Sequence, residues 1–434
     1  MEPLGEGNSL KSTELVIEGN CYISGKLEKC CIGVDDGKVV AIAKNLDGKK
    51  VHDYEGKLVL PAAVDAHVHF RDPGFTHKED FSTGSLSALC GGVTCVLDMP
   101  NTRPATVSLA SLRDKKKIAG SKSLVDFGLY AGVKPGTNVA GLAKEAVGFK
   151  LYMGATTGEL LVPDIASITK ELADIGASGK VLSVHAEDEG MRNKDVEKNL
   201  DDHLRNRSNT LETSAIKKIT RIAGKTCRLH ICHVSTRDSL ALVAGVPNLT
   251  SEVAPHHFLL DRSGNLGAFG KVNPPLRKRE DRQALFQALK EDAFDVIASD
   301  HAPHTIEEKE EEFDYAPSGV PGVETMVPLV MQHVKDRHLE LSGAVRRLCE
   351  RPSEIFGIRK GKIAVGYDAD FMIFDMTKTS VIMADDLHSK CGWTPYEGVN
   401  AVFPKAVFLR GQLMVENGSQ VGERMGRDLL AGHV

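Results

Sequence analysis

Short apolar runs recur along the middle of the chain, and most are separated by helix-like stretches rich in Ala, Leu, Glu and Lys. Such runs are typical of strands buried on both faces of a parallel sheet. Between residues 61 and 354 there are eight: VDAHVHF, VTCVLDMP, VDFGLYAG, VGFKLYM, VLSVHAED, RLHICHVS, LTSEVAPHH and DVIASDHAP. Eight buried strands alternating with helices over about 290 residues predict a (β/α)8 barrel, the TIM-barrel class of α/β fold.

The two ends of the chain have a different pattern, in which apolar and polar residues alternate between glycines. Near the N-terminus the dipeptides Asp36-Gly37 and Asp47-Gly48 are typical of hairpins or tight turns. Stretches such as KIAVGYDADFMIFD give the C-terminal end the same character. We therefore expect residues 1–60 and 355–434 to meet in one small β-sandwich domain, with residues 61–354 forming the barrel between them.

Composition and charge narrow the class of protein. The 434 residues are 41% hydrophobic and 26% charged, as in ordinary globular proteins, and the net charge of -5 gives no broad attraction to nucleic acid or anionic lipid. No membrane span or signal peptide is expected from the sequence. The nine cysteines, an odd number, favour reduced thiols in the cytoplasm over a disulfide framework.

Candidate metal ligands begin with His67-Val68-His69, at the end of the first predicted barrel strand. Residues i and i+2 of a strand point to the same face, so both imidazoles can enter the barrel mouth together. Imidazole suits Zn²⁺ and related divalent metals. The motif alone is a weak signal, because two partly exposed histidines on one strand are common.

Three further strand ends strengthen the metal-site prediction. His185, His233 and Asp300 each close a predicted barrel strand, and in this fold the catalytic groups lie at the C-terminal strand ends. With the first two histidines they could hold two metal ions and leave positions open for water. His230 lies three residues before His233, so we expect it on the opposite face of its strand.

Lys150 ends the fourth predicted strand. An ammonium group has no lone pair to offer a metal, and its plainest role is to balance nearby carboxylates. Reaction with carbon dioxide would convert the amine to a carbamate whose oxygens could bridge two metals. Cys232 neighbours His233 but is expected to face away from the metals, and His256 and His257 are expected to have structural roles.

Longer motifs are spread from about residue 55 to the C-terminal domain. They are residues 65–74 (DAHVHFRDPG), 98–104 (DMPNTRP), 271–277 (KVNPPLR), 299–304 (SDHAPH), 318–325 (SGVPGVET) and 390–397 (KCGWTPYE). Together these motifs resemble those of the dihydroorotase family. HxH with a terminal Asp marks only the wider amidohydrolase superfamily, whereas DMPNTRP combined with DHAPH and NPPLR is much more specific.

The resemblance implies a zinc-dependent hydrolase of cyclic amides that interconverts N-carbamoyl-L-aspartate and L-dihydroorotate in de novo pyrimidine (UMP) biosynthesis. It also implies Asp300 as general base and acid, a metal-bound hydroxide as nucleophile, and a homodimer. Two Zn²⁺ per subunit would be bound, one by His67, His69 and Asp300 and the other by His185 and His233, with Lys150 bridging them as N6-carboxylysine. Some dihydroorotases have aspartate in place of this lysine, so the number of metals occupied stays open.

Substrate contacts are implied in the same way. The residues that match the family's substrate-binding positions are His69, Arg71, Asn101, Asn273, His304, Ser318 and Gly319, the last two through the main chain. Physical chemistry agrees for Arg71, because a guanidinium is a planar donor fork suited to the carboxylate of dihydroorotate. If the strand continues, Arg71 also lies on the same face as His69.

Three other functions remain as alternatives. Allantoinase and hydantoinase use the same barrel and metal set on other cyclic ureides, but Arg71, Asn101 and the DHAPH motif favour a substrate with a carboxylate. A non-catalytic scaffold, like the metal-free relatives of dihydropyrimidinase, predicts lost ligands, whereas every ligand position here is filled. A metal-storage or sensing protein would not need the substrate-binding set.

Overall fold

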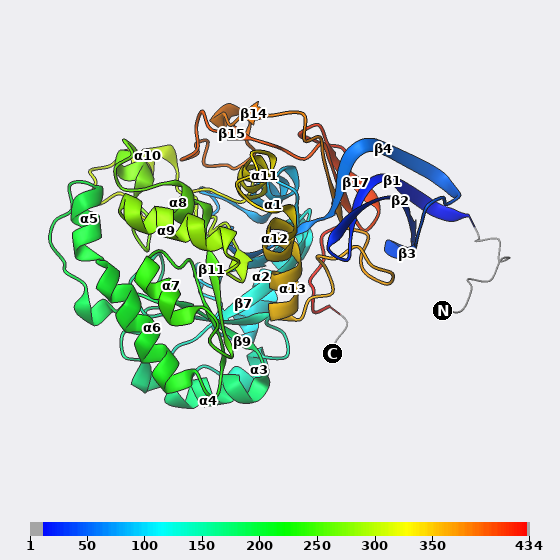
Figure 1. Ribbon diagram of the computed structural model, residues 1–434. Helices are drawn as coiled ribbons and strands as arrows, with labels where there is room; N and C mark the ends of the chain where they lie inside the picture. Colours follow the sequence, from blue (N-terminus) through cyan, green and yellow to red (C-terminus); the bar gives the residue numbers. More distant parts are fainter. Residues whose placement is uncertain (1–11, 432–434) are drawn as a thin grey trace.

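The computed structural model describes residues 12–431 of the chain. An eight-stranded parallel sheet surrounded by helices forms the larger part, and a separate eight-stranded mixed sheet lies beside it (Figure 1). The eight predicted runs are the eight parallel strands, in chain order, so the predicted barrel class is confirmed. These strands are β5 (Ala63–Val68), β6 (Val93–Asp98), β7 (Asp126–Gly132), β8 (Gly148–Tyr152), β9 (Val181–His185), β10 (Arg228–Ile231), β11 (Leu249–Val253) and β12 (Val296–Ile297).

The first and last strands of the parallel sheet are joined just beyond their C-terminal ends. Val68 and His301 form a parallel bridge, and the backbone N–H of His69 donates to the carbonyl of His301 at 2.8 Å. Every residue of β5 to β9 is buried, as expected for strands with helices outside and packed side chains inside. Closure brings the C-terminal ends of the strands to one face of the molecule.

Helices follow the strands and bury one face each. In α6 the buried positions Leu211, Ala215 and Ile219 recur every four residues, which is the period of a helix with one apolar stripe. Within residues 12–431 no helix is both long enough and apolar enough to cross a bilayer. The α-helices are α1 (Phe81–Cys90), α2 (Leu109–Lys122), α3 (Val139–Leu142), α4 (Thr169–Ser178), α5 (Leu200–Asn206), α6 (Asn209–Ala223), α7 (Arg237–Val243), α8 (Pro255–Leu259), α9 (Arg279–Lys290), α10 (Ile306–Lys309), α11 (Met326–Lys335), α12 (Leu341–Val345) and α13 (Arg351–Phe356).

Short 3-10 and π segments complete the helical part. The π segment η4 (Arg346–Glu350) joins α12 to α13 without a break. The 3-10 segments are η1 (Ile165–Ile168), η2 (Glu189–Met191), η3 (Gly267–Gly270) and η5 (Ala384–Asp386).

The mixed sheet combines both ends of the chain, as the alternating patterns predicted. Its order is β18-β17-β16-β13-β4-β1-β2-β3, and β4 pairs with β13 through partners such as Leu60 and Met372. Side chains of the sheet, among them Ile17, Val59 and Phe371, form a hydrophobic core of their own. The strands are β1 (Thr13–Ile23), β2 (Lys26–Asp35), β3 (Lys38–Ala43), β4 (Gly48–Pro61), β13 (Phe371–Phe374), β16 (Ala406–Leu409), β17 (Gln412–Glu416) and β18 (Ser419–Gln420); β14 (Ser380–Val381) and β15 (Asn400–Ala401) pair separately.

The two predicted turn dipeptides have different outcomes. Asp36-Gly37 joins β2 to β3 as a two-residue hairpin turn, and both residues have positive φ, 48° and 71°. Asp47-Gly48 instead leads into β4, which pairs in parallel with β1 rather than folding back on β3. The local sequence thus indicated a turn at both positions, but it did not indicate which strand would pair with β4. That pairing depends on the arrangement of the whole sheet.

Candidate active site and metal centre

The residues predicted at the strand ends converge on one cavity at the C-terminal face of the parallel sheet. Tyr152, Thr156, Thr157, Val272 and Ala302, which the sequence did not single out, contribute to its wall. His304 lies behind it, in contact with Arg71. The predicted residues that line the cavity are His67, His69, Arg71, Asn101, Lys150, His185, His233, Asn273, Asp300, Ser318 and Gly319.

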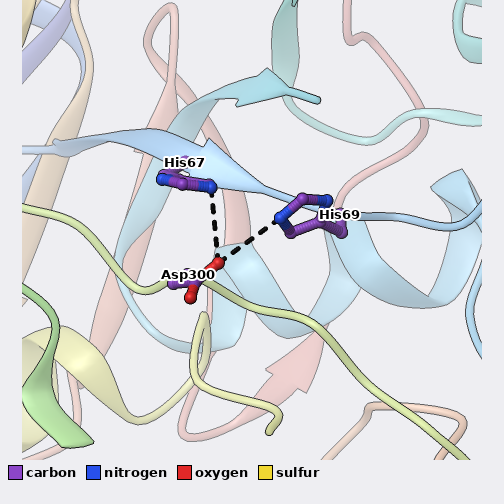
Figure 2. A group of neighbouring side chains, drawn as sticks. All are labelled: His67, His69 and Asp300. Atoms are coloured by element: carbon purple, nitrogen blue, oxygen red, sulfur yellow. Dashed lines mark ion pairs between the residues drawn. The ribbon is translucent and has the colours of Figure 1, made fainter. Parts of the chain in front are cut away.

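Figure 2 shows the side chains of His67, His69 and Asp300 pointing toward one another. Oδ1 of Asp300 lies 3.3 Å from Nε2 of His67 and 3.4 Å from Nε2 of His69. Burial lowers the pKa of His69 to about 3, so this imidazole is neutral near pH 7. Burial opposes ionisation of Asp300, but the contacts with His67 and His69 lower its pKa below the ordinary value. Imidazole nitrogens and a carboxylate in this arrangement suit a divalent cation such as Zn²⁺.

Hydrogen bonds from their second nitrogens orient both imidazoles. His67 Nδ1 contacts Oε1 of Glu252 at 2.5 Å, and His69 Nδ1 contacts Oδ1 of Asn101 at 2.7 Å. Because both partners are acceptors, each Nδ1 carries the proton and each Nε2 presents its lone pair toward Asp300. Glu252 was missed by sequence reasoning. The available signal was a single carboxylate within the buried run LTSEVAPHH.

His185 and His233 form a second pair of candidate ligands. Nδ1 of His185 lies 3.2 Å from Nε2 of His233, while the other nitrogen of His185 contacts Oε2 of Glu187 at 2.9 Å. This carboxylate fixes the proton on Nε2 of His185 and leaves a lone pair on Nδ1. Burial lowers the pKa of both histidines, so both stay neutral. Nδ1 of His233 has no hydrogen-bond partner within residues 12–431, so His233 can hold its proton there and offer Nε2, together with Nδ1 of His185, to one cation.

Lys150 is fully buried beside this pair. Its Nζ lies 2.9 Å from Sγ of Cys232 and 5.3 Å from the centre of the Tyr152 ring, and it forms no ion pair within residues 12–431. The prediction that Cys232 faces away from the metal residues is wrong. Its Sγ and ligand atoms of His67 and Glu252 lie within 4.8 Å of one another, because β10 ends at Ile231 and strand alternation no longer applies.

Three site residues have left-handed backbone, with φ of 61° at Arg71, 35° at His233 and 46° at Asp300. Such residues are uncommon outside glycine and cluster at functional sites. The turn at His233 also overturns the expectation that His230 must face away. Nε2 of His230 lies 3.0 Å from Oε2 of Glu252, and the backbone N–H of His233 donates to Oε1 of the same carboxylate at 3.1 Å.

Arg71 is a buried cation with only 2% of its surface exposed. Its Nε donates to the carbonyl of Pro303 at 3.2 Å, and its Nη2 lies 3.2 Å from Nε2 of His304. Burial lowers its pKa to about 10, and it forms no ion pair within residues 12–431. A buried charge without a counter-ion is costly, so this position favours an anionic ligand.

The other predicted substrate residues are already engaged in part. The side-chain amide of Asn101 forms two hydrogen bonds. Its Oδ1 accepts from Nδ1 of His69, and its Nδ2 donates to the carbonyl of Thr157 at 2.9 Å. The N–H of Gly319 donates to the carbonyl of Lys271, and a Cβ added at this glycine would lie 2.3 Å from the carbonyl oxygen of Ala302. Oδ1 of Asn273 is buried and has no hydrogen-bond partner within residues 12–431. Asn273 therefore keeps a free acceptor at the cavity.

Comparisons with known proteins agree on one family. The sequence profile described as "Amidohydrolase family" matches residues 58–414. A dihydroorotase from Thermoplasma volcanium is 40% identical over 96% of this chain and 97% of its own length, and one from Methanosarcina acetivorans is 39% identical over 91% and 90%. Among solved structures, the L-hydantoinase of Arthrobacter aurescens is similar with a TM-score of 0.91 at 29% identity, covering 96% of this chain and 99% of that one.

Proposed function

The chain belongs to the amidohydrolase family and, within it, to the dihydroorotases, and from this premise we propose that it interconverts N-carbamoyl-L-aspartate and L-dihydroorotate. The observation that carries the choice of substrate is the buried guanidinium of Arg71, which forms no ion pair within residues 12–431. A cyclic amide that bears a carboxylate would supply the missing partner. Hydantoin and allantoin carry no carboxylate and would leave this charge unpaired.

The donor atoms at the strand ends fit a pair of divalent metal ions, which we propose to be Zn²⁺. The observations that support this fit are the approach of Nε2 of His67 and of His69 to the carboxylate of Asp300, and the 3.2 Å separation of the His185 and His233 nitrogens. When bound, such ions lower the pKa of a water molecule toward neutrality and polarise the ring carbonyl. The proposed ligands are His67, His69 and Asp300 for one ion, His185 and His233 for the other, and Lys150, as N6-carboxylysine, for both.

Within this site Asp300 is the group placed to move protons. In hydrolysis its carboxylate accepts a proton from the attacking water and passes it to the departing ring nitrogen. In the biosynthetic direction it accepts the proton of the ureido nitrogen as the ring closes. Arg71 and His304, whose Nη2 and Nε2 lie 3.2 Å apart, hold the substrate carboxylate and so orient the reacting carbonyl.

The test of this proposal is a side-by-side turnover assay. The zinc-supplemented protein is expected to turn over dihydroorotate and neither allantoin nor hydantoin, since only the first carries a carboxylate for Arg71. The measurement is the initial rate of ring opening at matched substrate concentrations. Turnover of hydantoin or allantoin in place of dihydroorotate would keep the barrel and the metals but overturn the role proposed for Arg71.

A separate prediction concerns Lys150. We expect Lys150→Ala to lose bound metal and activity, because the carbamate that would bridge both ions cannot form, and we expect short carboxylic acids to restore part of both. Metal content per chain and turnover are measured together, with Lys117→Ala on the exposed face of α2 as control. Full metal content in the Lys150 variant would contradict the bridging role.

A further inference from the structure

A second group of side chains able to hold a metal ion lies outside the cavity of the active site. Cys90 is the last residue of α1, Glu324 lies two residues before α11, and His388 lies two residues after η5. All three line a cavity of about 300 Å³ whose other walls come mainly from residues 375–387 and 402–418. None of the three lines the cavity of the active site. The group is therefore independent of the chemistry proposed above.

Hydrogen bonds fix the direction in which His388 offers its lone pair. Nδ1 of His388 contacts Oε1 of Glu324 at 2.8 Å, and the backbone N–H of His388 donates to Oε2 of the same carboxylate at 2.8 Å. Since a carboxylate only accepts, Nδ1 carries the proton, and in the neutral imidazole Nε2 is left with the lone pair. This is the arrangement in which a carboxylate orients a metal-binding histidine.

The free nitrogen faces a thiol. Nε2 of His388 lies 3.9 Å from Sγ of Cys90. Zinc bound by sulfur at about 2.3 Å and nitrogen at about 2.05 Å, at a tetrahedral angle, separates the two ligand atoms by about 3.6 Å. One ligand atom from each of Cys90, Glu324 and His388 lies within 4.8 Å of the other two. A small adjustment of one side chain thus allows both atoms to bind the same ion.

The surroundings hold this geometry in place. Cys90 and Glu324 are buried, with 3% and 5% of their surface exposed, and the side chain of His388, which lines the cavity, is 28% exposed. A Cβ added at Gly91 would lie 2.7 Å from the carbonyl oxygen of Glu324, so the end of α1 and this segment are in direct backbone contact. Burial raises the pKa of both the thiol and the carboxyl, and a bound cation would favour their ionised forms.

A purely structural hydrogen-bond group is the alternative. In that case the thiol of Cys90 serves only as a weak donor to the carbonyl of Gly418, 3.6 Å away, and His388 and Glu324 form an ordinary ion pair. That arrangement accounts for Nδ1 of the histidine. In such an ion pair Nε2 of His388 also carries a proton and makes only a weak contact with Sγ of Cys90 at 3.9 Å. The neutral imidazole instead presents its lone pair to the thiol, beside a cavity large enough for water.

We propose that Cys90 and His388 bind one divalent transition metal ion of the Zn²⁺ class, with Glu324 orienting His388 and water from the adjoining cavity filling the remaining positions. The ion would tie α1 to the segment that follows η5. Further along that segment, Nε1–H of Trp393 donates to the carbonyl of His304 at 2.7 Å. Binding of the ion would therefore also stabilise the wall behind the proposed substrate-carboxylate site.

Cobalt substitution tests the proposal, because a thiolate bound to Co²⁺ gives a near-ultraviolet charge-transfer band that histidine and carboxylate ligands do not give. The full-length protein is stripped with a chelator and titrated with Co²⁺ alone. We expect a band that Cys232→Ser and Cys227→Ser leave in place and that Cys90→Ser removes. Cys232 is the thiol of the barrel site, and Cys227 is a buried thiol bonded to the carbonyl of Leu172.

Absence of any such band, or a band that Cys90→Ser leaves at full intensity, would overturn the proposal. His388→Gln provides a second variant, at a partly exposed side chain, and is expected to remove the same band. Glu324→Gln is expected to weaken Co²⁺ binding about 10- to 100-fold, as loss of an orienting carboxylate does. Because the readout is a spectrum and not turnover, failure here is distinct from failure of the proposed function.

Discussion

Asp300→Asn is expected to lower kcat for dihydroorotate hydrolysis by at least about 100- to 10,000-fold, the range that one positioned proton-transfer group contributes. Asparagine has nearly the same shape but cannot accept the proton of the attacking water. Oδ1 of Asp300 also lies 3.3 and 3.4 Å from Nε2 of His67 and of His69, so its loss removes a proposed metal ligand as well. Initial rates at saturating substrate measure the effect.

Metal content separates the two roles of Asp300. If the variant keeps its metal and loses turnover, proton transfer accounts for the effect; if it loses both, the ligand role contributes. Asp336→Asn, at the exposed C-cap of α11, is the matched control and is expected to leave kcat unchanged. A rate within a few-fold of the unmodified protein would remove Asp300 from the mechanism altogether.

Arg71→Met is expected to lower kcat/KM for dihydroorotate by about 30- to 5,000-fold, which corresponds to the roughly 2–5 kcal/mol lost when one partner of a buried charge pair is removed. The physical reason is that the substrate carboxylate would enter a buried site with its main cationic partner missing. The same change removes a buried charge that forms no ion pair within residues 12–431, which favours folding, and the hydrogen bond to the carbonyl of Pro303, which opposes it. We therefore expect little change in the midpoint of thermal unfolding.

Specificity provides the sharper measurement for Arg71. Any residual activity on hydantoin, which has no carboxylate, should be unchanged or raised in Arg71→Met, so the ratio of the two kcat/KM values should shift toward hydantoin. Arg71→Lys is expected to restore only part of the loss, since an ammonium lacks the planar donor fork. Arg113→Met, on an exposed side chain paired with Glu145, serves as control. An equal loss on both substrates would indicate a structural role instead.

Much of the site could be predicted because the strand ends of a barrel lie together whatever the packing of the surrounding helices. Eight buried runs fix the number of strands, and parallel strands of a closed sheet place their C-terminal ends on one face. His67, His185 and Asp300 each stand at or just beyond such an end, so their convergence on one cavity follows from the pattern alone. The alternating ends of the chain likewise predicted one shared β-domain.

The interior of the barrel was less accessible to sequence reasoning. Alternation assigned Cys232 and His230 to the far side of their strand, but β10 ends at Ile231 and the backbone turns through positive φ at His233. Glu252 then receives hydrogen bonds from two strands other than its own. A period-two rule describes a continuing strand and says nothing of the residues where the strand ends.

The barrel, its strand ends and the family of the chain could all be predicted from the order of the residues. Three other features became visible only in the folded chain: the hydrogen bond that orients His67, the absence of an ion pair at Arg71 within residues 12–431, and the approach of Cys90 to a histidine 298 residues away. The difference lies in the range of the interactions. Hydrophobic periodicity is a local property of the chain, whereas side-chain contacts between distant segments depend on the packing of whole elements, which no short stretch of sequence encodes.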